Sequence, residues 1–205
     1  MTEKNLNNFY DGWLYHLFID PFLRKVRRLV RRQLKPGSSL IDIGCGTGEL
    51  VFSLADWCKE LVGVEISQKM WSYAQKRSLD LPLTNVRIIL GDGTKLNDFP
   101  SGSFDYATAC MVLHEMDARQ RLPVLKEMKR LARNLILVDY RLPLPGNFAA
   151  LVCQSIERLA GNRHHRNYRS YLEGGGLIPL AETIGLTVQQ EVPLYDHCLH
   201  LLRSE

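Results

Sequence analysis

Apolar runs and helical segments alternate along most of the chain. Short apolar runs predict buried strands at residues 40–43, 61–65, 86–90, 104–110 and 135–140. The segments between them carry apolar residues at three- and four-residue steps, which predicts helices at 49–58, 67–81, 118–133 and 147–160. Such alternation is typical of a parallel sheet that is covered by helices on both faces. The pattern therefore predicts an α/β fold.

The two ends of the chain depart from this alternation. From about residue 10 to residue 34 the apolar positions have helical spacing, and Pro21 is expected to divide this segment into two helices. Near the other end, two short helices and two strands are expected at 168–173, 177–184, 187–192 and 198–203. A short connection joins these last two strands, so they must pair antiparallel, because a parallel crossover needs a dozen or more residues.

The size and composition are those of one globular domain. The chain has 205 residues, of which 45% are hydrophobic and 23% charged. We expect a single domain over 1–205, with an N-terminal helical lid at 1–36, a core at 37–160 and a tail with a terminal hairpin at 161–205. No apolar run approaches the roughly 18 to 20 residues of a membrane span, and the first residues lack a secretory pattern, so a cytoplasmic location is expected.

The cysteines do not form a recognisable framework. There are five, an odd number, and no Cys-x-x-Cys pair occurs among them. This is unlike a disulfide scaffold or a structural zinc site, so the thiols are expected to be reduced and no metal is expected. They are Cys45, Cys58, Cys110, Cys153 and Cys198.

Basic residues gather in two places, although the net charge of +4 is modest. Seven of them lie between Arg24 and Lys35, and a second group lies between Arg163 and Arg169. A solvated helix face explains such clusters most simply. A surface for an anionic substrate, or peripheral membrane contact through the N-terminal helix, is the next interpretation. Nucleic-acid binding comes third, because no recognised nucleic-acid module accompanies the clusters.

Three alternating glycines follow the first predicted strand, in the segment Asp42-Ile-Gly-Cys-Gly-Thr-Gly48. Gly44, Gly46 and Gly48 allow a sharp turn and a close approach of the backbone to a ligand. A dinucleotide fingerprint places its third glycine three residues after the second, whereas here it comes two residues after. The Asp42 carboxylate would also repel a pyrophosphate, and it favours a ligand with a positive amino group. The alternative is a turn without a ligand.

Acidic residues follow the next two predicted strands. Glu65 ends the second strand, where a carboxylate can accept hydrogen bonds from both hydroxyls of a ribose, and Ile66 would lie against an adenine ring. Asp92 and Gly93 follow the third strand; there a carboxylate can accept from the adenine amine while the next backbone amide donates to a ring nitrogen. Each could instead be an ordinary strand or turn end, but the three sites occur together.

These segments resemble a known family. The Asp42-to-Gly48 arrangement is similar to motif I of the class I S-adenosylmethionine (SAM) methyltransferases, and residues 61–70 are similar to their motif II. Residues 103–106 and 109–115 resemble the fourth-strand motif of the methyltransferase type 11 subgroup, which includes ubiquinone and menaquinone biosynthesis methyltransferases. The resemblance extends from about Phe9 to Leu186. One departure is the segment 130–135, where the family usually has a Lys-Pro-Gly-Gly turn.

The resemblance implies a fold and a cofactor. The fold is a Rossmann-like seven-stranded methyltransferase sheet in the order 3-2-1-4-5-7-6, with its last strand antiparallel, helices on both faces and an N-terminal helical lid. The cofactor is SAM, and S-adenosylhomocysteine is its product. The residues expected to bind it are Tyr10, Asp42, Gly44, Cys45, Gly46, Gly48, Glu65, Ile66, Asp92 and Gly93. Tyr10 enters as part of the lid, where an amphipathic helix that merely docks on the sheet is an equal interpretation.

Two residues at strand ends are candidates for catalysis. His114 follows the fourth strand, where the methyl group should project, and its ordinary titration range suits a general base at neutral pH. It could instead simply shape the pocket. Tyr140, at the end of the fifth strand, could stack on a substrate or donate a hydrogen bond. The resulting hypothesis is a SAM-dependent methyltransferase that acts on a small molecule. The alternatives are an RNA or protein methyltransferase and a noncatalytic SAM-binding module.

Overall fold

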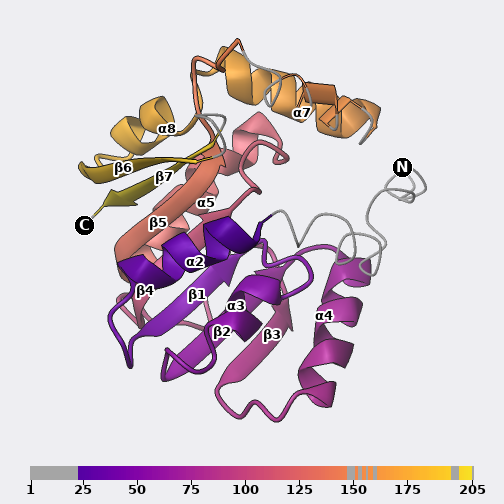
Figure 1. Cartoon of the computed structure of the whole chain (residues 1–205), viewed down its shortest axis with the longest axis vertical. Helices are drawn as coiled ribbons and strands as arrows, with labels where there is room; N and C mark the ends of the chain where they lie inside the picture. Colours follow the sequence, from indigo (N-terminus) through magenta and orange to yellow (C-terminus); the bar gives the residue numbers. More distant parts are fainter. Residues whose placement is uncertain are drawn as a thin grey trace. The chain divides into compact units, whose positions relative to one another are not determined.

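The computed structural model describes residues 23–146, 151, 154–155, 157–158, 161–194 and 199–204 (Figure 1). The chain falls into two compact units, Met1–Gly93 and Thr94–Glu205. The first unit contains α2 (Arg24–Gln33), β1 (Ser39–Ile43), α3 (Glu49–Ser53), β2 (Glu60–Glu65), α4 (Gln68–Asp80) and β3 (Val86–Leu90). The second contains β4 (Phe104–Cys110), α5 (Ala118–Leu131), β5 (Ala132–Tyr140), α7 (Asn162–Glu173), α8 (Leu177–Thr183), β6 (Val188–Leu194) and β7 (Leu199–Ser204).

The strands form one mixed sheet in the order β3-β2-β1-β4-β5-β7-β6. β2 pairs in parallel with both β1 and β3, and β4 pairs in parallel with β5. β7 runs antiparallel to both of its neighbours, β5 and β6. The predicted seven-stranded α/β fold, with its strand order and its antiparallel last strand, is confirmed.

Within the first unit, the sheet brings the strand ends that carry the candidate residues to one edge. All five residues of β1 are buried, and β2 is buried along nearly its whole length. In the parallel register Ile43 lies opposite Val64, and Glu65 lies opposite Leu90. The carboxyl ends of β1, β2 and β3 therefore lie side by side, so the loops that follow them share one edge of the sheet.

Within the second unit, β5 is the central buried strand. It pairs with β4 on one side and β7 on the other, and its last six residues are buried. Asp139, near its end, lies opposite His200 of β7 and is itself completely buried. A buried carboxylate at the end of a central strand requires hydrogen-bond donors around it, and these donors belong to the cluster described below.

Two predicted helices end earlier than expected. α3 stops at Ser53 rather than continuing to residue 58. The Ser53 hydroxyl donates to the Leu50 carbonyl oxygen at 2.7 Å, a local bond that competes with helix continuation. α5 stops at Leu131, and β5 begins at the next residue, Ala132, three residues before the predicted strand start. The helix-to-strand junction therefore contains no separate turn, which fits the lack of the Lys-Pro-Gly-Gly segment.

Two elements near the carboxyl end also differ from the prediction. α7 begins at Asn162, six residues earlier than expected, so the second basic group lies on a helix. β6 continues to Leu194 and includes Pro193. Proline cannot donate to a strand ladder, and β6 tolerates it because it is the edge strand of the sheet. Most of the predicted helix at 147–160, and the lid before residue 23, lie outside the described residues.

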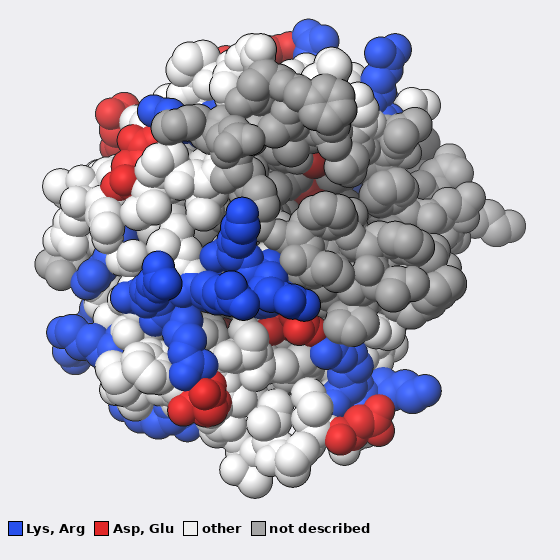
Figure 2. All heavy atoms as spheres, in the orientation of Figure 1, with Lys and Arg blue, Asp and Glu red and all other residues white. Residues whose placement is uncertain are grey.

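The basic face of α2 is prominent on the surface. Val26 and Val30 are buried, and the helix carries Lys and Arg at most of its other positions. Figure 2 shows lysine and arginine side chains gathered over this helix. Arg31 is held by Asp56, with which it makes two hydrogen bonds of 2.6 and 2.9 Å. In the part of the chain that the structure describes, no helix combines the length and apolar character that membrane crossing requires.

Candidate functional site

The glycine loop has the backbone that its sequence predicts. Gly44, Gly46 and Gly48 have φ angles of 73°, 56° and 77°, in the left-handed region that side chains with a Cβ rarely adopt. At Gly48 a Cβ would also lie 2.6 Å from Cε2 of Phe52. The three glycines are therefore required by conformation, and at Gly48 by space as well.

The backbone amides of this loop donate hydrogen bonds within the protein. Gly44 and Cys45 both donate to the Val64 carbonyl oxygen, at 2.8 and 3.0 Å. The Gly46 amide donates to Oε2 of Glu65 at 2.9 Å. A phosphate-binding loop directs several such amides at its ligand. In this loop the amides instead donate hydrogen bonds to the end of β2. This disfavours a phosphate and agrees with the inference against a dinucleotide drawn from the glycine spacing.

Glu65 links the loop to the helix that follows it. Its side chain is buried, with 8% of the residue exposed, and Oε1 accepts the Ser67 amide at 2.7 Å. Burial raises the pKa of Glu65, and hydrogen bonds from backbone amides offset this only in part. Since a carboxylate offers about four acceptor positions, the two amides leave acceptor capacity for the two hydroxyls of a ribose.

The adjoining candidates lie at the same edge of the first unit. Ile66 is 65% exposed, which is unusual for a large apolar side chain and leaves a surface on which a flat ring can stack. The Gly91 amide donates to the Glu65 carbonyl oxygen at 2.9 Å, so the segment that carries Asp92 and Gly93 is tied to the end of β2. Asp42, at the end of β1, is almost fully buried.

Two further residues support the glycine loop, and sequence reasoning did not identify them. Gly63 in β2 faces Cys45; a Cβ at Gly63 would lie 2.8 Å from the Cys45 sulfur. Arg77 of α4 forms an ion pair of 2.7 Å with Glu49, the first residue of α3. A glycine within an apolar strand was the available signal for the first. Arg77 offered none, because its partner lies 28 positions away.

In the second unit, the structure brings the two catalytic candidates together. His114 and Tyr140 are both buried, and their rings meet edge to face with centroids 4.9 Å apart. Asp139 orients the histidine: its Oδ1 lies 2.6 Å from Nδ1 of His114, and its Oδ2 accepts the His114 amide at 3.2 Å. The Tyr140 hydroxyl donates to Oε1 of Glu157 at 2.6 Å. These contacts form one connected polar network.

Two carboxylates shift the pKa of His114. Burial by itself lowers the pKa of His114, but the charges and hydrogen bonds of Asp139 and Glu157 outweigh it and raise the pKa well above the ordinary value. A raised pKa favours the protonated imidazole and so weighs against a general-base role for His114. The cause of the shift is the pair of carboxylates, of which one precedes Tyr140 and the other lies on a distant segment.

Glu157 and His164 complete the network and Arg121 lies beside it, over the Tyr171 ring; sequence reasoning identified none of the three as a site residue. Nε2 of His164 is hydrogen-bonded to Oε2 of Glu157. Arg121 of α5 donates to the carbonyl oxygens of Leu113, Met116 and Asn167, with distances of 3.0, 2.9 and 2.6 Å. A signal for His164 existed in the helical spacing, because the buried residues Tyr168 and Tyr171 follow it by four and seven positions.

The predicted site residues thus form two groups. All cofactor candidates among the described residues belong to the first unit, whereas both catalytic candidates belong to the second. Tyr10 and the lid around it lie outside the described residues.

A family model supports the resemblance seen in the sequence. Residues 40–134 match a model described as a methyltransferase domain. The chain is 35% identical over 114 residues to a nocamycin O-methyltransferase from Saccharothrix syringae. The matched segment covers 54% of the chain and 39% of that protein. It is 32% identical over 103 residues to a demethylmenaquinone methyltransferase from Bacillus cereus, which covers 49% of the chain and 42% of that protein. The chain thus matches about two fifths of the length of these relatives.

Solved structures share the fold over nearly the whole chain. A SAM-dependent methyltransferase from Aquifex aeolicus is similar with a TM-score of 0.69 at 19% identity, covering 95% of this chain and 98% of that one. A magnesium protoporphyrin IX methyltransferase from Synechocystis, solved with bound S-adenosylhomocysteine, gives a TM-score of 0.62 at 21% identity, covering 96% and 87%. Residues 40–134 of the chain therefore match a methyltransferase domain, and the fold is one that SAM-dependent methyltransferases share.

Proposed function

We propose that the protein transfers a methyl group from SAM to a small-molecule acceptor. The observation that carries this proposal is Glu65, a buried carboxylate that holds the Gly46 amide and still has acceptor capacity at the strand edge. Two relatives support the acceptor class, since their names specify nocamycin and demethylmenaquinone, both small molecules. The proposal covers the class of acceptor, a small molecule, and leaves the reacting atom open to carbon, oxygen, nitrogen or sulfur.

The residues of the first unit fit SAM. Glu65 would bind the ribose, Ile66 would lie against the adenine, and Asp92 with Gly93 would bind the adenine edge. Asp42 supplies a buried carboxylate near a loop whose amides are already occupied, which suits a ligand with a positive amino group rather than a phosphate. When bound, SAM supplies a methyl group on a sulfonium, with a neutral leaving group.

The polar network of the second unit would bind and orient the acceptor. His114 and Tyr140 are held by Asp139 and Glu157, so their orientations are fixed before an acceptor binds. Methyl transfer requires chiefly that the nucleophile be aimed, and fixed hydrogen-bonding groups serve that purpose. The side chains of Tyr168 and Tyr171, which are almost fully buried, provide aromatic surface around the same network.

Cofactor binding is the first test of this proposal. We expect the wild-type chain to bind S-adenosylhomocysteine in a calorimetric titration, and Asp92→Ala to weaken binding about 10- to 100-fold, because one charge-assisted hydrogen bond is lost. Asp98→Ala is the matched control: Asp98 is exposed on the loop that follows, and its removal should leave the affinity unchanged. No binding by folded wild-type protein, or equal binding by Asp92→Ala, would contradict the proposal.

A turnover assay then separates an enzyme from a noncatalytic module. Release of S-adenosylhomocysteine is measured with a panel of quinols, hydroxylated aromatic compounds and amines. Cofactor binding without turnover on any of them would favour the noncatalytic alternative. We expect turnover with at least one phenolic or quinol compound.

One observation favours a second candidate, methylation of an RNA. The basic face of α2 is a continuous positive surface, as Figure 2 shows, and such surfaces attract polyanions. This candidate requires association with RNA that weakens steeply with salt and is lost when Arg27, Arg28 and Arg31 are replaced together. An anionic membrane surface is the other partner that this face suits, and vesicles that contain phosphatidylserine distinguish it from RNA.

A further inference from the structure

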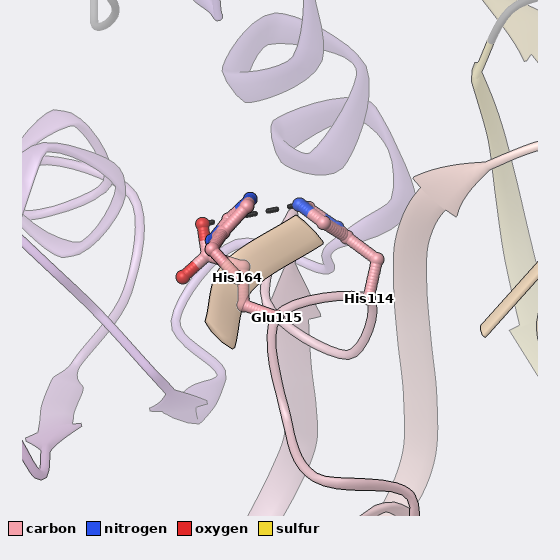
Figure 3. Close-up of side chains that lie close together, drawn as sticks. All are labelled: His114, Glu115 and His164. Atoms are coloured by element: carbon pink, nitrogen blue, oxygen red, sulfur yellow. Dashed lines mark ion pairs between the residues drawn. The ribbon is translucent and has the colours of Figure 1, made fainter. Parts of the chain in front are cut away.

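Three side chains of types that can bind metal ions lie together in the second unit. His114 and Glu115 come from the segment after β4, and His164 comes from α7; Figure 3 shows the three directed toward one another. One ligand atom from each lies within 4.8 Å of those of the other two. Side-chain exposure is 2% for His114, 9% for His164 and 25% for Glu115. The group is therefore mostly buried, with one partly accessible carboxylate.

The spacing of the ligand atoms is that of donors around one ion. Nε2 of His114 lies 3.8 Å from Oε1 of Glu115 and 3.5 Å from Oε1 of Glu157. The separation from Glu115 is too long for a hydrogen bond, and that from Glu157 lies at the outer limit of one. Two donors bound to one ion at about 2.0–2.2 Å in tetrahedral geometry lie about 3.4 Å apart. Small side-chain shifts would therefore place the ligand atoms of His114, Glu115 and His164 on a common ion, with Glu157 beside them.

His114 has the support that metal-bound histidines have. Its Nδ1 lies 2.6 Å from Oδ1 of Asp139, and the same carboxylate accepts the His114 and Tyr140 amides. A carboxylate at Nδ1 fixes the ring so that Nε2 faces the metal, an arrangement that recurs around metal-ligating histidines. In this chain Nε2 faces Glu115 and Glu157.

The carboxylates of the cluster make a cation favourable there. Three carboxylates, Asp139, Glu157 and Glu115, surround the two imidazoles, and the first two are almost fully buried. Buried carboxylates need positive partners. Arg121 supplies one charge nearby, but its guanidinium is hydrogen-bonded to carbonyl oxygens and to the Ser170 hydroxyl. A bound metal ion would add positive charge among these carboxylates.

We propose that His114, Glu115, His164 and Glu157 bind a divalent transition-metal ion. Two imidazoles with carboxylates suit Zn²⁺, Fe²⁺ or Co²⁺ rather than Mg²⁺ or Ca²⁺, which prefer oxygen ligands. An ion with an open position here would be available to an oxygen of the acceptor. That last role rests on the proposed function, whereas the binding site itself does not.

The test is metal binding by the untagged, full-length chain after treatment with a chelator. We expect calorimetric titration with ZnCl₂ to show one ion per chain, and CoCl₂ to give the visible absorption of a nitrogen- and oxygen-ligated Co²⁺. MgCl₂ should give no comparable binding. His164→Ala should weaken Zn²⁺ binding at least 100-fold, and Asp139→Asn, which removes only the orienting carboxylate, about 10- to 100-fold.

The neighbouring histidine provides the matched control. His165→Ala removes the same side chain at the next position of α7, outside the ligand group, and should bind Zn²⁺ as wild type does. Circular dichroism establishes that each variant is folded, and Glu115→Gln replaces His164→Ala if the latter is not. Absence of Zn²⁺ binding by folded wild-type protein would overturn the proposal. Equal binding by His164→Ala, or loss in His165→Ala, would also overturn it.

Discussion

Replacement of Arg121 by methionine is expected to lower the stability of the protein by about 3 kcal/mol or more. Arg121 is 3% exposed and donates to three carbonyl oxygens and to the Ser170 hydroxyl. Methionine fills much of the same volume but leaves these buried acceptors without their donor. In a chain of this size such a loss corresponds to a fall in Tm of about 6 to 12 °C, which thermal unfolding followed by circular dichroism measures.

Arg119→Met is the matched control for this prediction. Arg119 lies on the same helix, its side chain is 89% exposed and it pairs with Asp117 at the start of α5. Its replacement should change Tm much less. Arg121→Lys should fall between wild type and Arg121→Met, since an ammonium keeps the charge but cannot reach acceptors in several directions. Equal Tm values for Arg119→Met and Arg121→Met would show that the carbonyl network does not stabilise the unit.

Glu65→Ala should weaken S-adenosylhomocysteine binding about 100-fold or more, because two charge-assisted hydrogen bonds to the ribose would be lost. The variant also removes the acceptor that holds the Gly46 amide. Calorimetric titration measures the loss. Glu60→Ala is the control, since Glu60 begins the same strand and pairs with Arg87 at the surface. Unchanged affinity in folded Glu65→Ala would remove this residue from the cofactor site.

Because the pKa of Glu65 is raised, a fall in pH should increase the stability of the protein but weaken cofactor binding. Because the folded state takes up a proton at Glu65 more readily than the unfolded state, this group adds stability as pH falls through its raised pKa toward the ordinary value of 4.5. The ribose needs the ionised carboxylate, so cofactor binding should weaken over the same range. Both trends should be absent from Glu65→Gln. If wild type and Glu65→Gln follow the same pH profiles, Glu65 is not the titrating group.

The fold could be predicted because its signals are local. The glycines at 44, 46 and 48 predicted a sharp turn, and their φ angles of 56° to 77° are ones that glycine adopts readily. Element ends were less accurate where a side chain decided them, as at Ser53, whose hydroxyl bonds to the Leu50 carbonyl oxygen. The start of β5 at Ala132 was also missed, because no turn residue marks it.

The polar cluster could be predicted only in part because its members are distant in sequence. His114 was found from its place after a strand, but its pKa depends on Asp139 and Glu157, which are 25 and 43 positions away in the numbering. His164 was assigned to a basic surface group. Only the packing of α7 against the segment around Glu115, where Asn167 donates to the Glu115 carbonyl oxygen at 2.6 Å, reveals its neighbours.

The distribution of candidate residues between the two units has an evolutionary consequence. The proposed cofactor residues of the described chain lie between Asp42 and Gly93, within one unit, whereas the polar cluster comes entirely from the other. A lineage can therefore inherit cofactor use as one uninterrupted stretch of gene while selection changes the second stretch. Under the proposed function, substitutions after Gly93 would change the acceptor and leave these cofactor residues unaltered.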